Sequence, residues 1–169
     1  MTKDKANNPM RKKIFVEKVV INIGCAGDRE KIERALKLIN KITGRKPVVT
    51  KSRKRSTFGI ARGRPVGVKV TLRGRDAVEF LKKALKAVDN KLKASGFDDW
   101  GNVSFGVSEY IYLPEVKYDP DIGILGMDVC VSLRRPGAYL KNGRLSRRQR
   151  VTKEEAIDFM KKTFNVDIA

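Results

Sequence analysis

The chain has 169 residues, and 41% of them are hydrophobic, which is enough to bury the core of one folded domain. Its 38 Lys and Arg residues against 19 Asp and Glu give a formal charge of +19. This charge favours a polyanionic partner, with nucleic acid the first candidate and an anionic membrane surface the second. Because the chain has no histidine, it lacks the commonest general base and the commonest metal ligand.

The N-terminal third predicts an arm, a strand and a helix. Residues 1–13 are polar and basic and predict a flexible arm. A run rich in β-branched residues predicts a strand over 14–23. After a turn, the apolar spacing predicts a helix that Asp28 caps and that continues to about Thr43, where Gly44 suits a helix C-terminus.

The middle of the chain predicts two more strands and a second helix. We expect a short strand at 47–50 and a longer one at 66–72, where apolar and polar residues alternate strictly. Asp76 and Glu79 have the spacing of a capping box with Asp76 at the cap. The helix that follows is expected to bury apolar side chains as far as Leu92.

The C-terminal third predicts two further strands and a last helix. Alternation from Phe105 to Leu113 predicts a third long strand, and 127–133 predicts a fourth. The connection 114–126 carries several acidic residues. Thr152 and Glu155 form a second capping-box pattern, which predicts the start of the last helix.

These elements indicate an α+β fold, in which an antiparallel or mixed sheet carries helices on one face and basic loops protrude. No linker divides the chain, so we expect one RNA-binding domain over 14–169 after the arm at 1–13. Cys25 and Cys130 lack metal-binding or disulfide spacing, and we expect both to be small core residues. No apolar run approaches the roughly 20 residues that span a bilayer.

Two segments concentrate basic charge without any acid. The first, 45–64, holds eight basic residues together with Phe58 and several glycines, and the second, 134–150, holds seven. Lys and Arg would displace counterions from phosphates, and Phe58 and Tyr139 could stack on unpaired bases. Local packing is the alternative role for both aromatics. Together the two segments favour nucleic-acid binding.

The polar side of the expected sheet is a second candidate surface. Lys69, Thr71 and Arg73 share one face of their strand, and Asn22 interrupts an apolar strand. Such a face can hold shaped RNA, although an ordinary solvated sheet face would look the same.

Catalysis and metal binding have little support in the sequence. Asp98, Asp99, Asp119 and Asp121 could ligate Mg²⁺ in a nuclease, but they fall in separate loops that also read as solvated turns. We therefore expect no catalytic residue, no metal and no cofactor. The alternatives kept open are a Mg²⁺-dependent RNA-processing enzyme and a general nucleic-acid-packaging protein.

Seven short motifs resemble one family. They occur in order along nearly the whole chain: NPM (8–10), EKVVINIG (17–24), TGRKP (43–47), KVTLRG (69–74), GNVSFG (101–106), PEVKYD (114–119) and GMD (126–128). Together they resemble the large-subunit ribosomal protein five family, which binds 5S ribosomal RNA. The long basic segment 134–150 resembles the archaeal and eukaryotic version rather than the shorter bacterial one.

The resemblance implies a structural, non-enzymatic protein of the cytoplasmic ribosome. It would sit in the central protuberance of the large subunit and help attach 5S RNA to the 23S-type RNA, beside neighbouring proteins of that region and away from any membrane. Arg45 stands where bacterial members commonly have Gln. The residues expected at the 5S RNA are Asn22, Arg45, Lys46, Lys69, Thr71 and Arg73.

The resemblance also implies contacts beyond 5S RNA. Residues 51–64 match a loop that approaches peptidyl-site transfer RNA, and the residues expected there are Lys51, Arg53, Lys54, Arg55, Phe58, Arg62 and Arg64. Further ribosomal RNA is expected at Arg11, Lys12, Lys13, Arg134, Arg135, Lys141, Arg144, Arg147, Arg148 and Arg150. Asp119 and Asp121 would face small-subunit ribosomal protein thirteen across an intersubunit bridge.

Overall fold

The structure is a computed structural model, and it describes residues 13–55, 59–136 and 150–169. Five strands form one sheet in the order β2-β3-β1-β6-β5, and every neighbouring pair is antiparallel. The strands are β1 (Phe15–Gly24), β2 (Val48–Lys51), β3 (Pro65–Arg73), β5 (Asn102–Val107) and β6 (Met127–Arg134). The expected α+β fold is confirmed.

Alternation along the strands builds the core. On β1 the side chains of Val19, Ile21 and Ile23 are buried, whereas the residues between them are partly exposed. Val68, Val70 and Leu72 on β3 follow the same pattern, as do the odd-numbered residues 127–133 of β6. Because successive strand residues point to opposite faces, each strand contributes one apolar row to the same side of the sheet.

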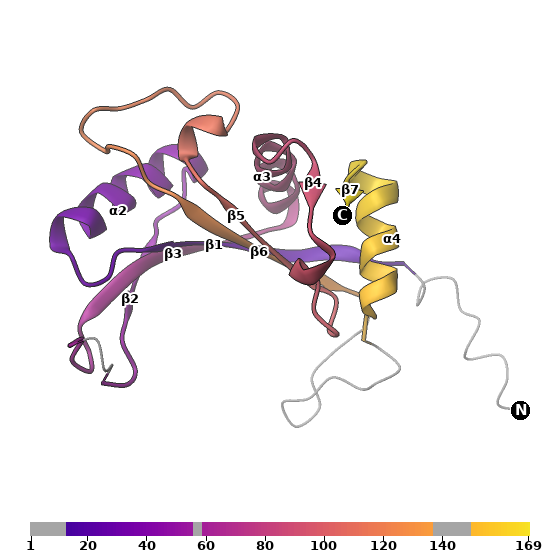
Figure 1. The fold of residues 1–169 in the computed structure, drawn as a ribbon, viewed down its shortest axis with the longest axis horizontal. Coiled ribbons are helices and arrows are strands. Elements are labelled where there is room, and N and C mark those ends of the chain that lie inside the picture. Colours follow the sequence, from indigo (N-terminus) through magenta and orange to yellow (C-terminus); the bar gives the residue numbers. More distant parts are fainter. Residues whose placement is uncertain (1–12, 56–58, 137–149) are drawn as a thin grey trace, which may run out of the picture.

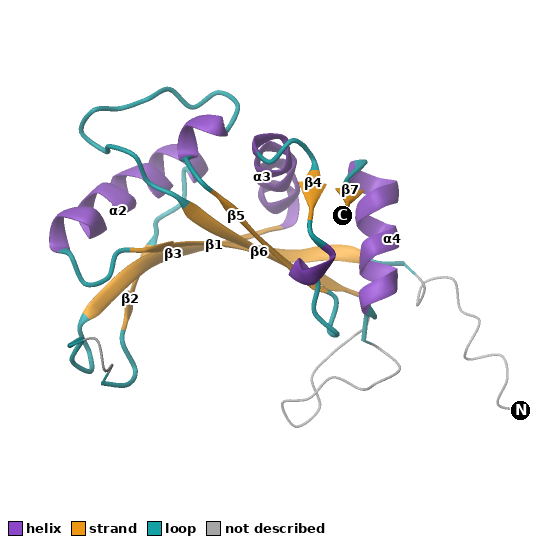
Figure 2. Ribbon diagram, in the orientation of Figure 1, coloured by secondary structure: helices purple, strands orange, loops and turns teal. Residues whose placement is uncertain are grey.

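Two helices cover that apolar side, α2 (Arg29–Thr43) and α3 (Gly74–Ala87). Figure 1 shows both helices on one side of the sheet, and Figure 2 shows that neither α2 nor α3 reaches the opposite side. The predicted start of α2 is confirmed, because Asp28 accepts a hydrogen bond from the Glu30 amide. Its predicted end is confirmed too, with Gly44 in the left-handed conformation.

The C-terminal helix α4 (Lys153–Phe164) begins as predicted. The Thr152 hydroxyl accepts from the Glu155 amide and the Glu155 carboxylate accepts from the Thr152 amide, which is a complete capping box. After α4 the chain forms β7 (Asp167–Ile168), which pairs in parallel with β4 (Lys91–Leu92). This small second sheet was not predicted, because two-residue strands leave no alternation to detect.

The predicted capping box of α3 is wrong. The helix begins at Gly74 and its cap position is Arg73, which makes no side-chain cap bond. Gly74 has a φ of 63°, which lets β3 turn directly into the helix. Asp76 therefore lies inside the first turn, where its charge suits the positive end of the helix and where it binds Arg45. The helix ends at Ala87, so Leu92 is buried in β4 and not in α3.

The expected strand from Phe105 to Leu113 is also wrong in its second half. The strand β5 stops at Val107, and Tyr110–Tyr112 forms a short 3₁₀ helix, η3. Tyr110 is fully buried and its hydroxyl accepts a hydrogen bond from the Asp119 amide. The apolar spacing that resembled a strand instead anchors the start of the long connection to β6.

The two cysteines differ in burial. Cys25 is buried as predicted, but Cys130 is exposed, so the expectation that both belong to the core is wrong for Cys130. Its neighbours Val129 and Val131 face the core, and the alternation of β6 turns Cys130 to the uncovered side of the sheet.

Candidate RNA interface

The face of the sheet opposite α2 and α3 collects polar and basic side chains from three adjacent strands. We call it the open face. The cross-strand rows on it run Lys69–Asn22–Asp128, Thr71–Val20–Cys130 and Arg73–Lys18–Ser132. The register thus brings together four of the six residues predicted at 5S RNA: Asn22, Lys69, Thr71 and Arg73. The Cβ atoms of directly opposed residues on neighbouring strands lie about 4.5–5.5 Å apart, so the polar and basic side chains of the open face are closely spaced.

A β-bulge organises one end of the open face. The register of β1 against β6 shifts between Val16 and Lys18, which turns Glu17 toward two arginines. Its Oε1 lies 2.9 Å from Nη1 of Arg134 and 3.7 Å from Nη1 of Arg73. One carboxylate therefore holds two guanidinium groups from strands on either side of β1. Arg134, predicted to bind other ribosomal RNA, belongs to the open face.

Arg45 and Lys46 lie apart from those rows. Nε and Nη2 of Arg45 donate to Oδ2 of Asp76 at 3.0 and 2.5 Å, and Asp76 belongs to α3. Arg45 therefore ties the end of α2 to the start of α3, on the side of the sheet that the helices cover. Lys46 follows it in the connection to β2 and is exposed.

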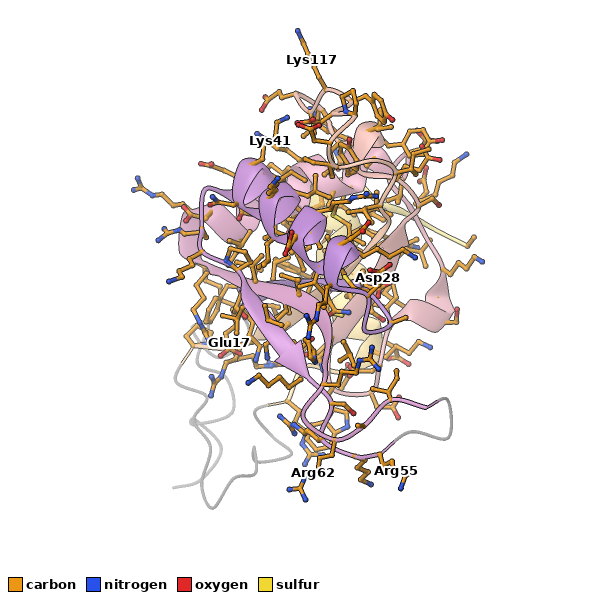
Figure 3. All side chains as sticks on the ribbon, turned by 90° about the vertical axis from the view of Figure 1, so that its left-hand side faces the viewer. Glu17, Asp28, Lys41, Arg55, Arg62 and Lys117 are labelled. Atoms are coloured by element: carbon orange, nitrogen blue, oxygen red, sulfur yellow. The ribbon has the colours of Figure 1, made fainter. Side chains whose placement is uncertain are left out.

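The basic loop 52–64 continues the hairpin of β2 and β3. Ser52 donates its amide to the Arg64 carbonyl at 2.9 Å, and the Gly63 amide donates to the Ser52 carbonyl at 2.8 Å. Beyond this paired base the side chains of Arg53, Lys54 and Arg55 are exposed. The hairpin leaves the sheet on the side away from the helices (Figure 1), and Figure 3 shows Arg55 and Arg62 at its far end.

The remaining residues predicted in this loop share its exposure or lie outside the description. Lys51, Arg62 and Arg64 are exposed, whereas Phe58 lies outside the described residues. Six residues predicted at other ribosomal RNA also lie outside the described residues: Arg11, Lys12, Lys141, Arg144, Arg147 and Arg148. The predicted arm lies outside them too, apart from Lys13, which is exposed. Tyr139 is outside them as well.

The ends of the second basic segment are held by the protein itself. Nη2 of Arg135 donates to both carboxylate oxygens of Glu155 at 2.6 and 2.5 Å, and only 16% of the Arg135 side chain is exposed. Burial raises the pKa of Glu155, but the hydrogen bonds from Arg135 and Thr152 outweigh it and leave that pKa below its ordinary value. Arg150 lies over the Trp100 ring, with Cζ 3.7 Å from the ring centroid.

The connection 114–126 is fastened to both covering helices. Lys41 of α2 donates to Asp119 at 2.7 Å, and Lys83 of α3 donates to Glu115. The hydrogen bond from Lys41 holds the pKa of Asp119 below its usual range. Asp121 stays exposed, and its amide donates to Oδ1 of Asp119 at 3.3 Å. This connection and the basic loop lie at opposite ends of the molecule, as Lys117 and Arg55 show in Figure 3.

Two of the four acidic residues weighed as Mg²⁺ ligands, Asp98 and Asp119, have structural partners. Asp98 accepts hydrogen bonds from the amides of Trp100 and Asn102 and from the Asn102 side chain, which closes a tight turn. Within 13–55, 59–136 and 150–169, no three His, Cys, Asp or Glu residues are grouped so that they could hold a metal ion. No helix in these ranges has the length and apolarity needed to cross a bilayer.

Sequence reasoning missed two residues at this surface. Lys18 lies between Arg73 and Ser132 on the open face, and the bulge beside it disguises its place in the alternation. The sequence pattern places Trp100 only in a loop, although half of its surface is exposed. An isolated Trp in a segment of polar residues was the available signal.

Comparisons with known proteins identify the family of this chain. Residues 8–60 match the family model described as "Ribosomal protein L5", and residues 65–165 match the model of the C-terminal region of the same family. The "Large ribosomal subunit protein uL5" of Sulfolobus acidocaldarius is 50% identical over 174 aligned positions, covering 99% of this chain and 97% of that protein. The protein of the same name from Sulfurisphaera tokodaii is 47% identical and covers 99% of this chain and 98% of its own length.

A third relative is slightly less similar and still covers nearly the whole chain. The "Large ribosomal subunit protein uL5" of Nanoarchaeum equitans is 45% identical over 95% of this chain and 98% of its own length. The predicted resemblance and its archaeal character are thereby confirmed, and so is the expected place in the large ribosomal subunit. The chain belongs to the ribosomal protein L5 family, a non-enzymatic family of the large ribosomal subunit.

Proposed function

We propose that this chain binds 5S ribosomal RNA through the open face and helps attach that RNA to the 23S-type RNA in the central protuberance. The observation that carries the proposal is the register of β3, β1 and β6. It gathers Lys69, Asn22, Thr71 and Arg73 on the face away from α2 and α3, where Lys69, Thr71 and Arg73 are exposed. Membership of a large-subunit family supports RNA as the partner.

The chemistry of the open face suits folded RNA better than a uniform polyanion. Lys18, Lys69 and Arg73 offer charge to phosphates, while Asn22 and Thr71 offer hydrogen bonds to 2′-hydroxyls or base edges. Glu17 and Asp128 on the same face repel a misplaced phosphate. Charge of both signs therefore favours one docking geometry, whereas the acid-free loops supply attraction that does not depend on geometry.

The other surfaces have separate partners in this proposal. Loop 52–64, with Lys51 at its base, approaches peptidyl-site transfer RNA, because its exposed cations stand clear of the sheet. The connection 114–126 faces small-subunit ribosomal protein thirteen with Asp121, since Asp119 is already paired with Lys41. The basic residues of 11–13 and those of 134–150 other than Arg134 and Arg150, which lie beside the open face, contact 23S-type RNA next to neighbouring proteins of the central protuberance.

A salt titration with matched RNAs tests the 5S assignment. We expect 5S RNA to bind more tightly than an unrelated structured RNA of equal length at every salt concentration, because shape recognition adds to phosphate binding. The log of the affinity should fall with the log of salt by roughly 0.7–0.9 per phosphate contact for both RNAs. Equal affinity for 5S RNA and duplex DNA at moderate salt would instead support the general packaging protein and overturn the proposal.

A further inference from the structure

Trp100 is the one tryptophan of the chain, and it is 51% exposed in the turn that precedes β5. The Arg150 guanidinium lies over its ring at 3.7 Å from the centroid. Among the described residues, no other ring or cation stacks against it. A large aromatic surface is thus left in solvent beside a planar cation, and the protein's own packing does not cover it.

The turn that carries Trp100 is rigid. Asp98 accepts hydrogen bonds from the amides of Trp100 and Asn102 at 2.9 and 2.7 Å. Gly101 has a φ of 73°, and a Cβ placed there would come within 2.6 Å of the Val151 Cβ. Because Val151 is buried and follows Arg150 directly, this close packing fixes the indole and the guanidinium relative to each other.

The pair lies at the β5 edge of the open face. Asn102, two residues after Trp100, pairs with Ser132, which extends the row of Arg73 and Lys18 across the sheet. In Figure 1 the segment between η2 (Ala94–Gly96) and β5 hangs on the side of the sheet away from α2 and α3. The edge is opposite to the one that carries the β2–β3 hairpin.

We propose that Trp100 and Arg150 form a stacking site for one unpaired base of the RNA that docks on the open face. Arg150 covers part of the indole, and the exposed remainder takes the flat face of a base. Asp99, exposed beside Trp100, disfavours a phosphate at that point, so a neutral base is the suitable occupant. The inference rests on the proposed function, since it assumes RNA on the sheet.

The single tryptophan gives a direct readout on the 169-residue chain. Saturation with 5S RNA should quench the Trp100 fluorescence by about half or more, because a base stacked on the indole quenches its excited state. A perfectly paired RNA duplex should leave the emission nearly unchanged. Unchanged emission at saturating 5S RNA would overturn the inference.

Variants separate stacking from a structural role. Trp100→Ala should weaken 5S binding about 5- to 100-fold, whereas Trp100→Phe should stay close to the wild type. Tyr112→Ala, which removes another aromatic ring of similar exposure from η3, beyond the other end of β5, is the matched control and should bind normally. If Trp100→Ala lowers the unfolding temperature but binds 5S RNA normally, the pair serves only the fold and the inference is wrong.

The two proposals fail in different ways. A chain that does not select 5S RNA at all contradicts the proposed function. A chain that selects 5S RNA with an unresponsive Trp100 contradicts only the stacking site, and an emission change caused by a protein of the large subunit instead of by RNA would also overturn it.

Discussion

The substitution Lys69→Glu should reduce affinity for 5S RNA about 100-fold or more, because a carboxylate opposite phosphates costs several kcal/mol. Lys69 is exposed on the open face beside Asn22, so the change removes no packing. The measurement is the dissociation constant for 5S RNA at constant salt, with thermal unfolding recorded for the wild type and the variant. The free energy of unfolding should be unchanged.

The matched control is Lys82→Glu on α3. Lys82 is exposed on the helix-covered side, and its replacement changes the net charge of the chain by the same amount. The affinity of the Lys82→Glu variant for 5S RNA should fall only by the small amount that follows from the lower net charge of the whole chain. Equal losses for the two variants would mean that 5S RNA senses total charge and not the open face.

A steric variant tests the same face without a charge change. Thr71→Trp should weaken 5S binding strongly, because an indole would stand above a row formed by Thr71, Val20 and Cys130. Tryptophan is well accepted in strands, so folding should be preserved. Thr163→Trp, at an exposed position of α4, is its control. Unchanged 5S affinity in Thr71→Trp would exclude the open face as the docking surface.

Removing positive charge from loop 52–64 should weaken transfer-RNA binding and leave 5S RNA binding intact. In the triple variant Arg53→Ala, Lys54→Ala, Arg55→Ala, 5S affinity should stay close to the wild type, while large subunits assembled with it should hold peptidyl-site transfer RNA less tightly. The loop stands clear of the sheet (Figure 3), and in the proposal above its exposed cations contact phosphates one by one. The measurement is transfer-RNA binding to the assembled ribosome over a range of salt.

The salt dependence distinguishes direct binding from indirect damage. The salt slope of transfer-RNA binding should decrease by roughly 0.7–0.9 for each phosphate that the variant no longer neutralises. A loss of 5S binding in the triple variant, with transfer-RNA binding intact, would show that the loop serves the 5S site.

The sequence was sufficient where one local signal dominated. Strict alternation located β3 and β6, and Asp28 and Thr152 located two helix starts because a capping side chain acts within three residues. It failed at Asp76, where a capping-box spacing occurs inside a helix whose start is set by the turn at Gly74. It failed after Val107, where apolar spacing of two also suits a short 3₁₀ helix around Tyr110.

The candidate site was predictable in part for a related reason. Lys69, Thr71 and Arg73 follow from the period of a single strand, but their neighbours depend on register, which no single strand contains. A run of charged residues in the sequence also overstates how many of those side chains can contact a partner. Arg45, Arg135 and Asp119 are each engaged by a residue distant in sequence, and a linear pattern cannot show such pairs.

The most direct measurement of the open-face assignment uses Cys130. It is exposed in the central row of that face, whereas Cys25, the other cysteine, is buried and provides an internal reference. Partial desolvation raises the pKa of the Cys130 thiol and Asp128 raises it further, so alkylation is best followed at mildly alkaline pH.

With 5S RNA bound to saturation, the rate of Cys130 alkylation should fall roughly tenfold or more, and an unrelated RNA of equal length should protect it far less. An alkylation rate that stays the same in the saturated 5S complex would contradict docking on the open face.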